Sequence, residues 1–211
     1  MEPLSPEKVE RSRGRERASL GQDIPVVSFP NQVKIIVLQH PQEPDKELGS
    51  AVLLVRALEQ AELRVGLSWR SLKALAGESA QNGEWGVLYL GAKGKSFLKA
   101  VNFVNAKNEL LSEEPKLKGV IVLDGTWSQA KALWWRNSWL TRLKRIVLSP
   151  QRKSLYGRLR REPRPDALST IESAALALGV LDPRGPDVQL HLEQAFQKML
   201  AEYQKGRPAK P

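Results

Sequence analysis

The chain of 211 residues contains no cysteine and only two histidines, His40 and His191. Without cysteine there is no disulfide framework and no zinc or iron–sulfur site held by thiolates. Two histidines so far apart in the sequence do not favour a histidine-built metal centre either. We therefore expect a protein that works without a bound metal.

Long apolar runs are also missing. The longest, such as Ala51 to Val55 and Gly119 to Leu123, fall far short of a bilayer span. The first twenty residues show no apolar core of the kind a signal peptide needs. We expect no membrane partner and a cytoplasmic location. With 41% hydrophobic residues, the chain is rich enough in apolar side chains to form the core of one folded domain.

The sequence is rich in basic residues, and their placement is uneven. The chain has 33 basic and 23 acidic residues, a net charge of +10. Residues 131–164, the basic stretch, hold eleven basic side chains and one acid, so this stretch carries the whole net charge. A cluster of one sign is typical of a polyanion-binding face, and arginine suits bidentate phosphate contacts. A loop that merely aids solubility is the alternative; we favour nucleic acid.

The order of apolar and polar residues predicts an α/β domain over 23–205, between flexible tails at 1–22 and 206–211. Short runs rich in apolar residues predict strands at 33–38, 62–67, 85–90, 118–123 and 145–148, the first of them rich in β-branched residues. Helical spacing predicts helices at 46–60, 69–75, 127–140, 170–179 and 187–204. This alternation indicates a mostly parallel sheet with helices on both faces. The long loop after Leu148 is of the kind that usually carries function.

The segment Ile121 to Trp127, IVLDGTW, is the sharpest motif. An apolar strand ends in Asp124 and passes at once into a helix, and ligands in open α/β sheets bind beyond the carboxyl ends of strands. Thr126 and Gln129 have capping-box spacing, so a structural role explains Thr126. Asp124 lies outside that box. We therefore favour a functional role for Asp124 and a structural one for Thr126.

Two further segments stand next to predicted strands or helices. Ser169 and Glu172 again have capping-box spacing, yet a helix start with free amides is also a ready site for a polar ligand. These two interpretations are evenly balanced. His40, in the segment LQHPQEP, follows the first strand and precedes a proline, which favours a turn element over an acid–base group.

Tryptophan is concentrated on the helix predicted after Trp127. Trp134 and Trp135 are adjacent and point about 100° apart, whereas Trp135 and Trp139 are four residues apart and should share a face. One face is expected to be core. Another could stack bases next to Arg136.

Taken in order, DGTW after an apolar strand, RREP at Arg160 to Pro163 and LSTIES at Leu168 to Ser173 resemble the DTW-domain family. The segments HPQE and LYLG resemble two further motifs of that family, and the likeness runs from about residue 33 to residue 177. Members are tRNA-uridine aminocarboxypropyltransferases, which move the 3-amino-3-carboxypropyl group of S-adenosylmethionine (SAM) to N3 of a uridine and release methylthioadenosine. The resemblance also implies a SPOUT-like fold with a C-terminal knot.

The resemblance implies a set of site residues. Asp124 and Trp127 would lie at the reacting centre. SAM would be bound by residues of the strand-end and helix-start loops, namely Leu90, Gly91, Asp124, Thr126, Leu148, Ser149, Leu168, Ser169, Thr170 and Glu172. The tRNA would contact basic side chains, namely Arg136, Arg152, Lys153, Arg158, Arg160 and Arg161.

One feature departs from the family. Many members carry an N-terminal cysteine-rich element resembling a zinc site, and this chain has no cysteine. A different RNA substrate is therefore an alternative, as are a ribosomal-RNA aminocarboxypropyltransferase or an RNA methyltransferase on the same fold. A non-catalytic RNA-binding protein is the alternative from outside the enzymes.

Overall fold

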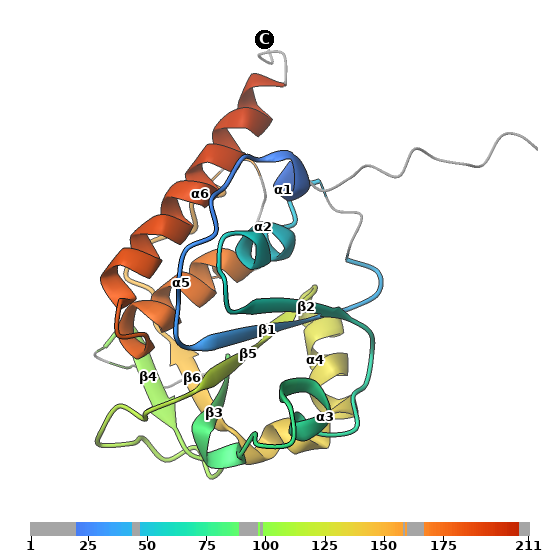
Figure 1. Cartoon of the computed structure of the whole chain (residues 1–211), viewed down its shortest axis with the longest axis vertical. Helices are drawn as coiled ribbons and strands as arrows, with labels where there is room; N and C mark the ends of the chain where they lie inside the picture. Colours follow the sequence, from blue (N-terminus) through green and yellow to red (C-terminus); the bar gives the residue numbers. More distant parts are fainter. Residues whose placement is uncertain are drawn as a thin grey trace, which may run out of the picture.

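The computed structural model describes residues 20–43, 47–88, 97, 99–157, 159 and 167–206. Its centre is one six-stranded sheet in the order β2-β1-β5-β3-β6-β4 (Figure 1). The strands are β1 (Lys34–Gln39), β2 (Ala61–Val65), β3 (Trp85–Leu88), β4 (Val101–Val104), β5 (Gly119–Asp124) and β6 (Lys144–Leu148). All neighbours pair in parallel except β4, which pairs antiparallel with β6. The mostly parallel sheet predicted from the sequence is confirmed.

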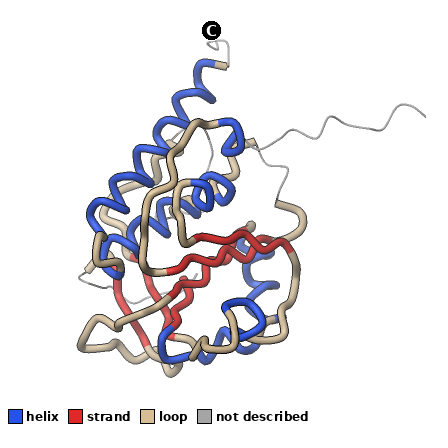
Figure 2. Tube along the Cα trace, viewed as in Figure 1, coloured by secondary structure: helices blue, strands red, loops and turns tan. Residues whose placement is uncertain are grey.

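Helices cover both faces of this sheet, as the alternation predicted; Figure 2 shows them on either side of the strands. They are α1 (Leu20–Asp23), α2 (Ala51–Arg56), α3 (Leu72–Ala76), α4 (Trp127–Arg136), α5 (Thr170–Leu181) and α6 (Gly185–Lys205), with the short 3-10 helices η2 (Asn82–Glu84) and η3 (Ser138–Arg142). No described helix combines the length and the apolar composition that crossing a bilayer requires.

The central strands are buried on both faces because successive side chains point to opposite sides. Ile35 and Val37 of β1 join the core cluster that contains residues of α2, α5 and α6. Ile36 and Leu38 of the same strand join the second cluster, with residues of α3, α4 and η3. The four consecutive apolar residues 35–38 therefore pack alternately into two hydrophobic cores, one on each face of the sheet. This is why the strand has no polar face.

Two predicted helices extend too far at their carboxyl ends, and tertiary contacts explain both errors. The helix predicted at 46–60 is observed as the shorter α2, which ends at Arg56 because Leu58 leaves the helical path to form a bridge with Phe29. The helix predicted to reach residue 140 ends at Arg136. There the buried Asn137 donates its side-chain amide to the carbonyl oxygens of Leu133 (2.7 Å) and Leu67 (3.0 Å). A side-chain amide that donates to a helix carbonyl oxygen replaces the backbone amide that would donate to it in a further helical turn.

This early end overturns the shared face predicted for Trp135 and Trp139. Trp139 lies in η3 and is 8% exposed, whereas Trp135 on α4 is 77% exposed. Strand β4 was also not predicted. At the ends of the chain, α1 contains the last three residues of the expected N-terminal tail. Residues 1–19 and 207–211 lie outside the described residues.

Candidate active site at the carboxyl edge of the sheet

Asp124 ends β5 at the carboxyl edge of the sheet, in register with Gln39, the last residue of β1. Its half-buried carboxylate accepts hydrogen bonds on both oxygens. Oδ2 accepts from Nε2 of Gln39 at 2.8 Å, and Oδ1 accepts from the hydroxyl of Thr170 at the start of α5. We call these three residues the carboxylate site. Because a carboxylate offers about four lone-pair positions, two donors fix its orientation and leave room for a ligand.

The chain passes from Asp124 into α4 through a turn that requires glycine. Gly125 has a φ of +156°, and a Cβ atom there would lie 2.9 Å from Cβ of Gln129. Thr126 caps α4: its hydroxyl accepts from the Gln129 amide at 3.4 Å, while its own amide donates to the Gln129 side chain at 2.6 Å. The structural role predicted for Thr126 is therefore confirmed. Trp127 is the first residue of α4 and is half-buried.

His40 borders the same edge. Its backbone amide donates to the carbonyl oxygen of Asp124 at 3.0 Å. Its ring Nδ1 accepts from the Gln42 amide at 3.3 Å, and its carbonyl oxygen accepts from the Glu43 amide at 2.9 Å. The turn predicted for this histidine is confirmed, and the turn borders Asp124.

The start of α5 has the capping box that the sequence predicted. The Ser169 hydroxyl accepts from the Glu172 amide, and the Glu172 side chain accepts from the Ser169 amide at 3.0 Å. The Ile171 amide donates to the hydroxyl of Ser50 at 3.3 Å. Two first-turn amides therefore already have protein partners, and the group that α5 offers to the carboxylate site is the hydroxyl of Thr170.

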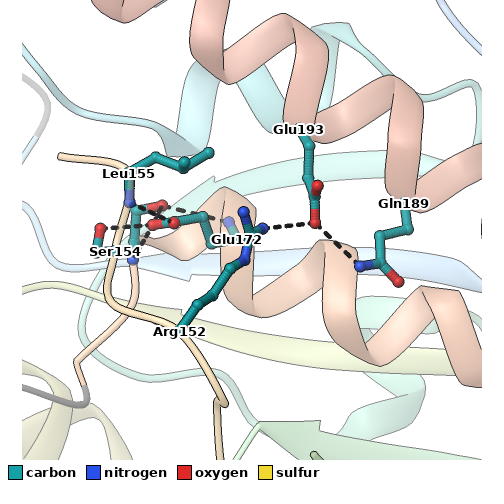
Figure 3. Close-up of polar contacts among 7 residues, drawn as sticks. Arg152, Ser154, Leu155, Glu172, Gln189 and Glu193 are labelled. Atoms are coloured by element: carbon teal, nitrogen blue, oxygen red, sulfur yellow. Dashed lines mark hydrogen bonds and ion pairs between the residues drawn. The ribbon is translucent and has the colours of Figure 1, made fainter. Parts of the chain in front are cut away.

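Glu172 also holds the loop that follows β6 (Figure 3). Its side chain is 2% exposed, and it accepts from the Ser154 hydroxyl at 2.7 Å and the Leu155 amide at 2.8 Å. A buried carboxylate needs such donors, since an unpaired one is costly. The position of residues 154–155 therefore depends on the first turn of α5, the same turn that supplies Thr170.

A second contact ties this loop to α6. Arg152 lies 2.6 Å from the carboxylate of Glu193, which also accepts from Gln189 at 3.0 Å (Figure 3). Arg152 was predicted to bind RNA. The structure gives its charge a partner in the protein, so an RNA phosphate at this position would have to share the guanidinium with Glu193.

Besides Arg152, the predicted site residues fall into four groups. Asp124 and Thr170 are in direct contact, and Thr126, Trp127, Ser169 and Glu172 lie in the helix starts on either side. Leu148 ends strand β6, Ser149 follows it, and Leu168 precedes the cap of α5; all three are half-buried. Leu90, Gly91, Arg158, Arg160 and Arg161 lie outside the described residues. Lys153 and Arg136 are exposed, Arg136 at the opposite end of α4 from Asp124.

Gln39 is the site residue that the sequence analysis missed. It is 2% exposed, and its side-chain Oε1 has no hydrogen-bond donor among the described residues. The available signal was a polar residue at the end of an apolar strand, VKIIVLQ, in the position that Asp124 occupies in IVLD. Within the described part of the chain, no cluster of three histidine or acidic side chains could hold a metal ion.

Comparison with known proteins gives one consistent set of relatives. The DTW domain family matches residues 16–204. The tRNA-uridine aminocarboxypropyltransferase 2 of Macaca fascicularis is 30% identical over 152 residues, covering 70% of this chain and 47% of the relative. The tRNA-uridine aminocarboxypropyltransferase A of Arabidopsis thaliana is 26% identical over 209 residues, covering 89% and 78%.

The mouse tRNA-uridine aminocarboxypropyltransferase 2 is 28% identical over 163 residues, covering 75% of this chain and 51% of the relative. The chain thus spans about half the length of the Macaca and mouse proteins. No solved structure matches the chain.

Proposed function

Because the chain belongs to the DTW domain family, we propose that it transfers the 3-amino-3-carboxypropyl group of SAM to N3 of a uridine in tRNA. The observation that supports this most is the Asp124 carboxylate, which two donors orient at the carboxyl edge of the sheet. The relatives are named for this activity. The proposal includes the SPOUT-like arrangement with a C-terminal knot that the family resemblance implies.

The chemistry of the described edge suits SAM as a co-substrate. SAM carries an ammonium group, a carboxylate and ribose hydroxyls, and its sulfonium makes the attached methylene carbon electrophilic. The edge offers the free lone pairs of Asp124 and the hydroxyls of Thr126 and Ser149. These oxygens suit an ammonium and hydroxyl groups, and we assign them, with Leu148, Leu168 and Thr170, to the SAM-binding surface.

Asp124 is the proton acceptor in this proposal. Uridine N3 carries a proton at neutral pH, so the carboxylate takes that proton as N3 forms a bond to the methylene carbon. The carbon–sulfur bond breaks, and its electron pair stays on sulfur, which leaves as the neutral thioether methylthioadenosine. Gln39 and Thr170 keep the carboxylate aimed, because each donates to a different oxygen. Trp127, the next aromatic along the chain, bounds the reacting centre.

Which carbon of SAM the uridine attacks is decided by orientation, since the sulfonium activates all three carbons attached to it. The helix starts of α4 and α5 are both capped within the protein, so the groups between them are held rigidly. Glu172 contributes by fixing residues 154–155 of the loop after β6. Basic side chains of the basic stretch, including Lys153 and Arg136, neutralise tRNA phosphates.

The experiment that tests this function uses SAM labelled in the aminocarboxypropyl carbons and, in a parallel reaction, SAM labelled in the methyl group. We expect the protein to transfer label to bulk tRNA from the first reaction alone and to release methylthioadenosine. Label from the methyl group would make it a methyltransferase. Label in ribosomal RNA but not tRNA would change the substrate, and tRNA binding without transfer from either reaction would leave only an RNA-binding protein.

A further inference from the structure

One tryptophan of the segment 134–139 is exposed while its two neighbours are packed. Trp135 is 77% exposed. Trp139 is 8% exposed and donates its indole N–H to the carbonyl oxygen of Trp69 at 2.9 Å. Trp134 is half-buried, with the guanidinium of Arg145 5.5 Å from its ring centroid. Packing therefore accounts for two of the three rings and leaves the third in solvent.

The backbone that carries Trp135 is held firmly. Just after it, the Asn137 side chain accepts from the Trp69 amide at 2.7 Å and donates to the carbonyl oxygens of Leu67 and Leu133. These bonds join the end of α4 to the connection between β2 and α3, and Figure 1 shows that connection running past α4. A ring on such a rigid support loses little entropy when a flat partner stacks on it.

Two exposed cationic side chains lie near Trp135 in the sequence of α4, and a third lies on the connection to which Asn137 is bonded. Lys131 lies one helical turn before Trp135, Arg136 follows it, and Arg70 lies on the connection that Asn137 holds. Among the described residues, no carboxylate lies within ion-pair distance of these three side chains. We call Lys131, Trp135, Arg136 and Arg70 the tryptophan surface.

Several other basic side chains of the described chain differ in this respect. Lys34 and Arg64 share Glu62, and the hydrogen bond from Lys34 is the main cause that lowers the pKa of that carboxyl. Arg152 is paired with Glu193. The tryptophan surface therefore concentrates charge that the described part of the fold does not neutralise.

We propose that the tryptophan surface binds a single-stranded segment of the RNA substrate, with one base stacked on the indole of Trp135 and phosphates on the three cations. This rests on the RNA partner of the proposed function. Aromatic faces stack bases of any sequence, and unpaired arginine and lysine attract the adjoining phosphates. Trp135 comes eight residues after Trp127, about 12 Å along the helix axis. The stacked base is therefore a neighbour of the modified uridine, not the uridine itself.

An acidic protein segment is the other class of partner that cations attract. The cores of protein–protein interfaces are depleted of charged side chains. Here Lys131 and Arg136, on the same helix as the indole, are both exposed and charged. Cationic side chains without carboxylate partners, next to one exposed aromatic ring, favour a nucleic acid over an acidic protein segment as the partner.

The test measures binding of the full chain to bulk tRNA and to a fluorescent single-stranded oligouridylate, by anisotropy, at several salt concentrations. We expect Trp135→Ala to weaken binding about five- to a hundredfold, the range for losing one stacked base, with an unchanged salt slope. Trp135→Phe should retain most of the affinity. Arg136→Gln should instead reduce the slope of log affinity against log salt by about one. Leu190→Ala, at another exposed apolar residue (56% exposed), is the matched control and should bind as the wild type does.

Equal affinity of Trp135→Ala and wild type for both RNAs would overturn the proposal, as would a wild type that binds neither. If Trp135→Ala loses affinity for a polyglutamate peptide and keeps its affinity for RNA, the surface binds an acidic protein. That result would overturn the proposal as well. Failure of the proposed function gives a different result, because the wild type would then bind RNA through Trp135 without releasing methylthioadenosine. Conversely, active transfer with an unchanged KM for tRNA in Trp135→Ala would remove the surface and keep the function.

Discussion

At the scale of the residue, two neutral donors from distant parts of the sequence hold the Asp124 carboxylate. Gln39 donates from the end of β1 and Thr170 from the start of α5. A carboxylate that is already oriented loses less freedom when it accepts a proton from a bound substrate, and this gain appears in kcat. Gln39 and Thr170 are therefore positioning residues for the proposed base.

Removing either donor should slow the reaction without affecting tRNA binding. We expect Gln39→Met and Thr170→Val each to lower kcat about ten- to hundredfold, the loss of one hydrogen bond to a charged group, with the KM for tRNA unchanged. Steady-state kinetics of methylthioadenosine release measures both quantities.

Thr170→Ser keeps the hydroxyl and is the matched control, which should remain near the wild-type kcat. An unchanged kcat in Gln39→Met, at saturating SAM and tRNA, would show that this hydrogen bond does not position the base.

Some residue roles were predictable because their causes are local. The capping boxes of Thr126 and Ser169 depend on side chains three residues apart, and both are confirmed. The partners of Asp124 and the bonds from Ser154 and Leu155 to Glu172 join residues far apart in the sequence. Such contacts follow from strand order, which the sequence pattern does not specify. Gln39 was missed for this reason.

At the scale of the element, the turn between β5 and α4 couples the base to the cap of the following helix. Gly125→Ala places a Cβ atom 2.9 Å from Cβ of Gln129, at a φ of +156° that side chains rarely adopt. We expect the free energy of unfolding to fall by about 1–3 kcal/mol, from backbone strain and a weakened cap. Because Asp124 adjoins the turn, kcat should fall as well. Denaturant unfolding and steady-state rates check the two effects.

Gly83→Ala is the control for this substitution. Gly83 lies in η2, and no atom lies within 4 Å of the Cβ atom that alanine would add. We expect stability and activity near those of the wild type. If the two variants unfold alike, steric strain at the β5–α4 turn is not what requires glycine.

Strands were predicted better than helix ends. Four of the five parallel strands, β1, β3, β5 and β6, are apolar runs that are mostly buried, which leaves a clear pattern in the sequence, whereas the edge strand β2 is half-buried or exposed. Strand β4 was missed because VNFV is only four residues long and contains a buried polar residue, Asn102, whose side-chain amide donates to the carbonyl oxygen of Lys99 at 2.6 Å. The ends of α2 and α4 depend on Phe29 and Asn137, which act through tertiary contacts.

At the scale of the whole molecule, the described residues of the basic stretch do not all form one exposed surface. Within the basic stretch, Arg145 is buried and stacks on Trp134, and Arg152 pairs with Glu193. The side chains of Lys131 and Arg136, like that of Trp135, are instead exposed to solvent. The described part of this cluster thus contains cations that contact other side chains of the fold and cations that are exposed to solvent, a division that composition alone does not reveal.

The proposed transfer needs the fold, the Asp124 carboxylate and the RNA partner together, and one measurement tests all three. It is the tRNA-dependent release of methylthioadenosine by the wild type and by Asp124→Asn, with SAM affinity determined in parallel. We predict release by the wild type, and a rate at least about a hundredfold lower in Asp124→Asn, the usual contribution of a general base. SAM should bind both proteins with similar affinity. Equal rates in the two proteins would contradict the account.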